Sequence, residues 1–137
     1  MIKRARCLAV TFASLLCLLS FSQIVAAHSP PEPAKAYFGG HTRTTRTANL
    51  ELVLEGRVVR LYVRDRRNWP VDIRHLQARI HFTHLEETRD IELAPGAKSA
   101  LVGEADIDLA ELKRVRLEIH ARGQDPQVIW MQLAESD

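Results

Sequence analysis

Alternation of apolar and polar residues over 49–65 constrains the fold more than any other feature of the sequence. Three leucines occupy every second position of its first half: Leu50, Leu52 and Leu54. A period of two residues places alternate side chains on opposite faces of a β-strand. Between the two halves, Glu55-Gly56 supplies the glycine that a tight turn needs. The pattern predicts a β-hairpin with one buried face and one wet face. The polar residues expected on the wet face of the first strand are Asn49, Glu51 and Glu55.

Apolar alternation and turn signals continue through the rest of the chain. Further strands are expected over 76–82, 88–93, 101–102, 115–119 and 128–133. Asp108 is followed three residues later by Glu111, which resembles a capping box and predicts one short helical turn over 109–113. About seven strands, each with one apolar face to bury, predict an all-β, immunoglobulin-like β-sandwich as the domain over 48–134.

Residues 1–27 have the three parts of a cleavable signal peptide. A basic start is followed by an apolar run over 7–21 and then by Val25-Ala26-Ala27, whose small or branched side chains suit a cleavage site. An uncleaved membrane anchor is the alternative, although the stretch is barely as long as the roughly 20 residues that cross a bilayer. The segment therefore predicts export to the periplasm, with no membrane attachment after cleavage.

Cleavage changes what the composition means. The two cysteines of the chain, Cys7 and Cys17, lie in the signal peptide, so the mature chain has no disulfide and no thiolate metal site. The segment also holds three basic residues, which reduces Lys and Arg from 19 to 16 against 17 Asp and Glu. A nearly neutral domain argues against a nucleic-acid partner. Residues 28–47 are expected to be an irregular N-terminal tether, because Ser29-Pro30-Pro31-Glu32-Pro33 favours an extended chain.

Motifs that would indicate catalysis are missing from the sequence. It has no nucleophile elbow, no phosphate-binding loop, no dinucleotide fingerprint and no His-Glu-x-x-His zinc motif. The three mature serines, Ser29, Ser99 and Ser136, fall in expected loops or at the ends of the chain. The sequence therefore predicts a protein that is not an enzyme.

Histidines are the only candidates for a metal site. Cleavage after Ala27 would leave His28 at the N-terminus, where its α-amine and imidazole could chelate Cu(II) with His41 as a further ligand. His81 and His120 are the second choice, because both fall on the polar faces of their expected strands. These strands would be neighbours if they were third and sixth of an immunoglobulin-like order, so the two imidazoles could share a metal. The ordinary alternative for each of these histidines is a solvated surface residue.

Arginines cluster in the second expected strand. Arg57, Arg60 and Arg64 are candidates for binding an anionic partner surface. The alternative is a solvated face whose charge is balanced by Glu51, Glu55 and Asp65, with each exposed pair adding little stability.

Several segments together resemble one protein family. They are Phe38-Gly39-Gly40-His41, Leu50-Glu51-Leu52-Val53, Leu61-Tyr62-Val63-Arg64-Asp65, Trp69-Pro70-Val71 and Ile91-Glu92-Leu93-Ala94-Pro95. In these the chain resembles the small exported β-sandwich proteins, loosely YtkA-like, that are often encoded beside heavy-metal efflux systems in Gram-negative bacteria. The resemblance implies a periplasmic location and a role in handling a metal, copper among them.

Two functional hypotheses follow. The first is a non-enzymatic periplasmic accessory or binding domain that handles copper beside an efflux system. The second is a metal-free interaction module that contacts a protein of the cell envelope through an exposed strand edge or the arginine-bearing face.

Overall fold

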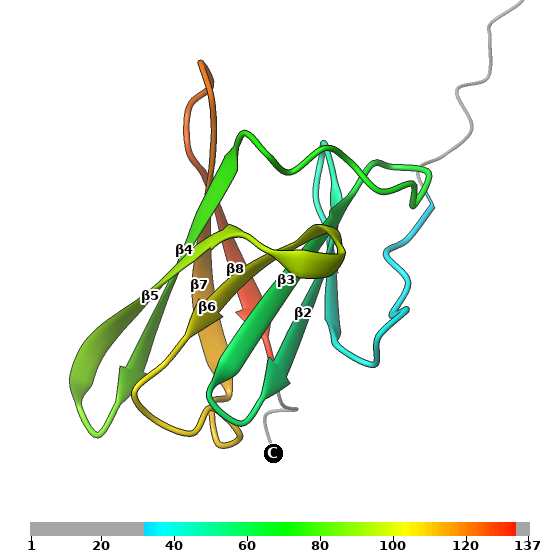
Figure 1. The fold of residues 1–137 in the computed structure, drawn as a ribbon. Helices are drawn as coiled ribbons and strands as arrows, with labels where there is room; N and C mark the ends of the chain where they lie inside the picture. The colour runs from blue at the N-terminus through cyan, green and yellow to red at the C-terminus, as the bar shows by residue number, and fades with distance from the viewer. Residues whose placement is uncertain (1–31, 134–137) are drawn as a thin grey trace, which may run out of the picture.

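Residues 32–133, the part of the chain that the computed structural model describes, form eight β-strands and one 3-10 turn (Figure 1). The strands of the first half are β1 (His41–Thr44), β2 (Asn49–Glu55), β3 (Val58–Arg64) and β4 (Leu76–His84). The second half contains β5 (Glu87–Pro95), the 3-10 turn η1 (Ala97–Ser99), β6 (Ala100–Glu104), β7 (Arg114–Ala121) and β8 (Gln127–Gln132).

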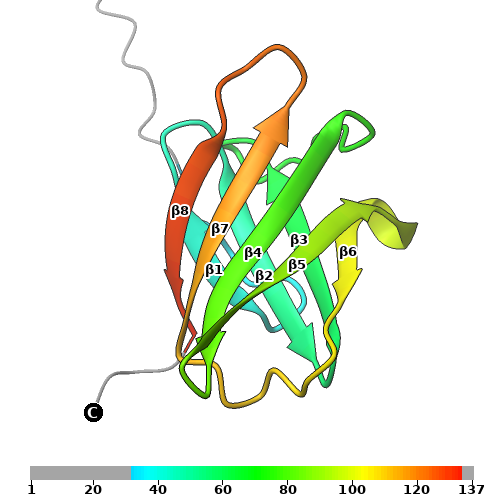
Figure 2. The same cartoon turned by 90° about the vertical axis from the view of Figure 1, so that its left-hand side faces the viewer.

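All neighbouring strands run antiparallel, in the order β1-β2-β3-β6-β5-β4-β7-β8. The sheet folds over so that β1-β2-β3-β6 faces β5-β4-β7-β8 (Figures 1 and 2). β5 joins the two layers, because its first part pairs with β4 and its last two residues pair with β6. The neighbours β2-β3-β6 and β4-β7-β8 follow the A-B-E and C-F-G relations of immunoglobulin-like sandwiches. The predicted all-β sandwich is therefore confirmed.

The prediction of a helical turn over 109–113 is wrong, because the structure has no helix at these residues. Leu112 N–H donates to the Leu109 carbonyl at 3.1 Å, and Asp108 Oδ1 accepts from Ala110 N–H at 2.9 Å, which makes isolated turns without a helix. β7 begins at Arg114, so the capping-like pair has no room for further helical residues. The 3-10 turn of the described chain lies instead at η1, directly after the expected Ala94-Pro95-Gly96 turn.

The core lies between the two layers and is built from the inward side of the predicted alternation. Leucine, isoleucine and valine side chains from both layers are almost completely buried there. The largest of them are Leu50, Leu52, Leu61, Ile80, Leu93, Leu101, Leu109 and Leu117. Their burial supplies the main stabilisation of the fold, at about 25 cal/mol for each Å² of apolar surface removed from water.

The outer face of β2 was predicted to be exposed to solvent, but most of it is buried. Asn49 and Glu51 are 2% and 1% exposed, and Glu55 alone of the three expected residues is exposed. They are buried because residues 32–40 lie across the outer face of β2 and β3. We call this segment the strap. The strap lies within the irregular tether expected over 28–47, and residues 41–44 of that range form the strand β1 instead of an irregular chain.

Glu51 is the anchor of the strap. Its carboxylate accepts the backbone N–H groups of Tyr37, Phe38 and Gly40 at 2.9, 2.7 and 3.0 Å. Arg64, 11% exposed at its side chain, lies 3.5 Å from the same carboxylate. Burial raises the pKa of Glu51, but the backbone hydrogen bonds and then the charge of Arg64 outweigh burial and hold that pKa below its ordinary value.

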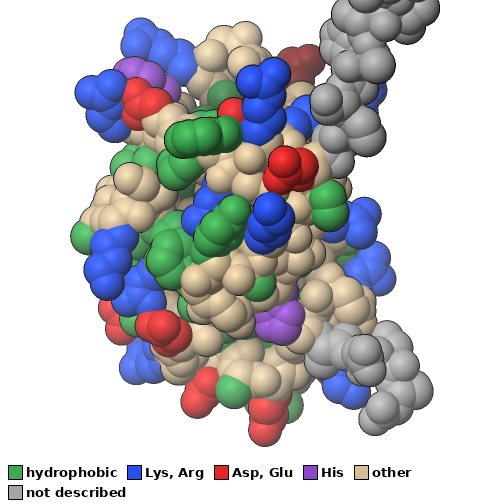
Figure 3. All heavy atoms as spheres, turned by 90° about the vertical axis from the view of Figure 1, so that its right-hand side faces the viewer, with side chains coloured by type: hydrophobic (Ala, Val, Ile, Leu, Met, Phe, Trp, Pro, Cys, Tyr) green, Lys and Arg blue, Asp and Glu red, His purple; other side chains and the backbone are tan. Residues whose placement is uncertain are grey.

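Aromatic side chains seal the strap to the sheet. The ring of Phe38 stacks on that of Tyr62 with centroids 4.0 Å apart, and the guanidinium of Arg64 lies 4.0 Å over the ring of Tyr37. Gly40 passes so close to β2 that an added Cβ would lie 2.5 Å from the Leu52 carbonyl oxygen. Figure 3 shows the strap's side of the molecule, where hydrophobic side chains gather near the centre among scattered charges.

Replacing Glu51 with Gln should destabilise the domain by about 3 kcal/mol at neutral pH, because it leaves Arg64 and backbone donors without a charged acceptor. Urea unfolding measures the change. Glu55→Gln is the matched control, since its exposed pair with Arg60 contributes at most about 1 kcal/mol.

We also expect the difference in stability between wild type and Glu51→Gln to depend on pH. A carboxylate whose pKa is lowered on folding stabilises the fold above its ordinary value of 4.5 and loses that contribution as pH falls through the lowered pKa. The gap between wild type and Glu51→Gln should therefore shrink as pH falls below 4.5. A constant gap down to acid unfolding would contradict this role for Glu51.

Candidate functional site

The outer face of the β5-β4-β7-β8 layer is the candidate functional site. One row of directly opposed residues crosses all four strands: Asp90 faces His81, His81 faces Arg116, and Arg116 faces Trp130. All four side chains lie on the outer face, since their strand neighbours Ile80, Ile91, Leu117 and Met131 are buried in the core. Antiparallel register thus places an acid, an imidazole, a guanidinium and an indole side by side.

Carboxylates hold the two histidines of this face. His81 Nδ1 lies 2.5 Å from Asp90 Oδ1, and its Nε2 lies 3.3 Å from Glu118 Oε2. His120 Nε2 lies 2.6 Å from the other oxygen of Glu118. The hydrogen bond from His120 is the main cause that lowers the pKa of Glu118, with a smaller contribution from His81. Glu118 therefore links the two imidazoles as an ionised acceptor.

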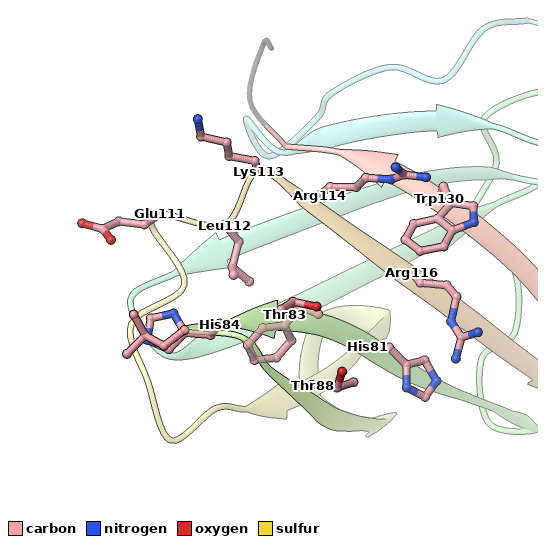
Figure 4. A pocket seen from close by; sticks show the side chains of 12 residues that line it. His81, Thr83, His84, Thr88, Glu111, Leu112, Lys113, Arg114, Arg116 and Trp130 are labelled. Carbon is pink, nitrogen blue, oxygen red and sulfur yellow. The ribbon is translucent and has the colours of Figure 1, made fainter. Parts of the chain in front are cut away.

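A groove of about 630 Å³ opens beside this row, between the β4–β5 hairpin and the turn before β7 (Figure 4). Such a volume lies within the range of about 300–1,000 Å³ that is usual for binding pockets. In Figure 4, Arg116 lies between Trp130 on β8 and His81 on β4. The other lining residues are Phe82, Thr83, His84, Leu85, Thr88, Glu111, Leu112, Lys113 and Arg114.

Two large apolar side chains at the groove are open to solvent. Leu85 is 83% exposed at the tip of the β4–β5 hairpin, and Trp130 is 51% exposed on β8. The guanidinium of Arg114 lies 4.0 Å over the Trp130 ring, a cation–π contact that fixes the indole on this face. Exposed aromatic and aliphatic groups beside arginines are typical of protein-binding surfaces.

The backbone at the hairpin tip is strained. Leu85 and Glu86 form the two-residue connection between β4 and β5 with φ angles of 48° and 66°. Such turns favour Asn-Gly or Gly-Gly, because a bulky side chain is costly at positive φ. Strained positions that persist in a fold cluster at functional sites. The tip therefore holds a bulky apolar side chain in solvent at a position where the turn itself favours a small polar one.

The predicted histidine ligands are placed as follows. His28 lies outside the described residues, and His41 begins β1, opposite Leu52. The prediction that the strands of His81 and His120 are neighbours is confirmed, since β4 pairs with β7. The register, however, sets His120 opposite Gln77 and His81 opposite Arg116, so the two imidazoles meet through Glu118 and not directly.

Within residues 32–133, no group of three or more His, Cys, Asp or Glu side chains is arranged to hold a metal ion. Copper handling through His28 and His41 therefore stays a prediction from the sequence. The same stretch also contains no helix that is long and apolar enough to cross a membrane.

The arginines expected to bind a partner have internal contacts instead. Arg64 is buried against Glu51 and the strap. Arg60 pairs with Glu55, and Arg57 Nε donates to the Ala105 carbonyl at 2.9 Å. Only the Arg60–Glu55 pair matches the alternative of a solvated, charge-balanced face, because Arg64 is buried and Arg57 bonds a backbone carbonyl.

Sequence reasoning missed Arg116, Trp130 and Leu85 as site residues. The alternation over 115–119 sets Arg116 on a polar face, which is the available signal for it, whereas the sequence favours core or edge packing for Trp130. Their meeting depends on the β7–β8 register, which the alternation alone leaves open.

Comparison with known proteins found no protein family, no curated protein and no solved structure that matches the chain. The resemblance to exported proteins of efflux systems is thus an expectation that rests on the residues alone.

Replacing Leu85-Glu86 with Asn-Gly should stabilise the domain by about 1–2 kcal/mol, because Asn and Gly adopt the positive φ angles of this turn at a lower cost. Urea unfolding measures the gain, and Glu86→Gly alone should give the smaller part of it. An unchanged free energy of unfolding in the double variant would show that the turn is not strained.

His120→Ala should raise the pKa of Glu118 toward its ordinary value of 4.5, because its main hydrogen-bond donor is lost. His81→Ala should raise it less, since that contact is the longer one. NMR titration of the side-chain carboxyl carbon measures both, with Gln77→Ala as the control next to His120. A pKa of Glu118 that is equal in all four proteins would contradict the link.

Proposed function

We propose that this chain is a non-enzymatic binding domain, exported to the periplasm, that contacts a protein of the cell envelope through the outer face of β5-β4-β7-β8. Export is part of the proposal and rests on the basic, apolar and small-residue regions of residues 1–27. An interaction module of the envelope is the second hypothesis from the sequence, and the exposed groove supports a version of it in which the partner binds this face.

One observation carries the proposal: the groove combines solvent-exposed Leu85 and Trp130 with cations for which the described residues provide no carboxylate partner. Within residues 32–133, the ion pairs of the domain include neither Lys113 nor Arg116. Desolvating such a mixed surface against a partner removes apolar area from water and gives the free cations acceptors.

The opposite layer supports the assignment by contrast. Its outer face is covered by the strap, which buries the Tyr62 and Val53 side chains that would otherwise be exposed. The β5-β4-β7-β8 layer has no such cover within the described chain, and half or more of its outer-face residues are exposed. On the opposite side the exposed aromatic side chains, Tyr37 and Phe38, belong to the strap, so among the described residues the β5-β4-β7-β8 layer is the one that presents its own strands to a partner.

Photocrosslinking in the producing cell tests the binding face. A photoreactive benzoylphenylalanine that replaces Leu85 should give one discrete adduct, because that position lies at the groove rim. The matched control is the same group at Asp125, an exposed position in the hairpin between β7 and β8. Mass spectrometry identifies the adduct, and added unlabelled domain should reduce its yield. Equal labelling from both positions, or none from position 85, would reject the proposal.

A further inference from the structure

We propose that the groove binds an acidic segment of the partner, with a carboxylate on Arg116 and an apolar side chain against Trp130 and Leu85. This inference rests on the proposed function and specifies the chemistry of the partner. The ligand is a peptide segment, and binding to an anionic lipid surface instead would contradict the inference.

Charge is the first argument. Three cations, Lys113, Arg114 and Arg116, line the groove against one carboxylate, Glu111. The other arginine on this outer face, Arg79, is already paired with Glu92 on the neighbouring strand. A carboxylate side chain that enters the groove therefore meets more cations than carboxylates among the lining residues, since Asp90 and Glu118 are already engaged with His81, and a basic segment would be repelled.

Arg116 is the side chain in that lining that can bind a carboxylate specifically. Its neighbours across the sheet are His81, which is engaged by Asp90 and Glu118, and Trp130, which offers no carboxylate. A guanidinium presents a planar fork of donors that matches a carboxylate in two parallel hydrogen bonds. The side chain is partly buried, so a salt bridge formed there is less screened than one at an exposed position.

The exposed apolar side chains of the groove imply that the ligand carries an apolar group as well as a charge. Trp130 is held in place by Arg114, and Leu85 stands at the rim on the strained hairpin. Thr83 and Thr88 add hydroxyl groups that can hydrogen-bond a peptide backbone. An inorganic anion would leave the apolar surface uncovered. A segment that alternates acidic and apolar side chains matches both parts of the groove.

The concave shape favours a peptide over a membrane. The groove is bounded by the 84–88 hairpin on one side and by the turn that includes Glu111 and Lys113 on the other (Figure 4). A flat lipid surface would touch this rim before it reached Arg116 between Trp130 and His81. A single peptide segment is narrow enough to reach Arg116 without any movement of the hairpin or the turn that bound the groove.

Fluorescence of Trp130 reads out binding directly. The full secreted chain carries Trp69→Phe, which removes the other, 69% exposed tryptophan and leaves Trp130 as the single reporter. The probe is the capped peptide Gly-Glu-Leu-Glu-Leu-Glu-Gly, and the control peptide has Gln in place of each Glu. The acidic peptide should change the emission saturably. The neutral peptide should bind about tenfold more weakly or not at all, because it lacks the charge-assisted hydrogen bonds.

Arg116→Gln should weaken binding of the acidic peptide by about tenfold, the loss expected for one hydrogen bond to a charged group. Arg122→Gln is the matched control, since that exposed arginine lies outside the groove and should leave the affinity unchanged. Thermal unfolding of both variants confirms that each is folded. Rising salt should weaken the wild-type interaction more than that of Arg116→Gln.

Three results would overturn the inference: equal affinity for the acidic and neutral peptides, equal affinity in wild type and Arg116→Gln, or binding only to vesicles of phosphatidylglycerol. Crosslinking separates this failure from that of the proposed function. An adduct from position 85 that persists unchanged in Arg116→Gln would keep the binding face and reject the acidic segment. Loss of that adduct in Arg116→Gln, but not in Arg122→Gln, would support both.

Discussion

The buried carboxylate of Glu51 is the interaction on which the arrangement of this domain depends. A charge at a site that is 1% exposed is tolerated because three backbone N–H groups and the Arg64 guanidinium surround it. The three backbone donors come from the strap, so the carboxylate and the strap require each other. Without the strap, Glu51 would return to water and the outer face of β2 and β3 would expose Tyr62 and Val53.

This dependence explains why the sequence predicted the strands better than their surroundings. Period-two alternation is a local signal, and the strands over 49–55, 58–64 and 114–121 lie close to where it placed them. Burial of Asn49 and Glu51 is not local, since it depends on residues more than ten positions away that cross the same face. Nothing in the alternation distinguishes a polar side chain in water from one that accepts hydrogen bonds from a distant segment.

The candidate site shows the same limit at the level of register. Topology reasoning placed the strands of His81 and His120 side by side, and the pairing of β4 with β7 agrees. The antiparallel register then decides which residues meet, and it brings Arg116 to His81 and Gln77 to His120. A shift of four residues along one strand would have put the imidazoles opposite each other. Register follows from the whole set of core contacts, which explains why Glu118 was not foreseen as the link between them.

The strap also makes the two outer faces of the sandwich unequal. In an immunoglobulin-like sandwich, both layers have an outer face with a similar pattern of polar residues. Here the strap covers one face with stacked aromatic rings and a buried ion pair, so the side chains beneath it serve stability. On the other face, the row Asp90–His81–Arg116–Trp130 is at least partly exposed to solvent. The groove lies there, next to the strained hairpin. Because the strap covers the outer face of β2 and β3, the strand side chains that remain exposed for binding are mainly those on the outer face of β5-β4-β7-β8.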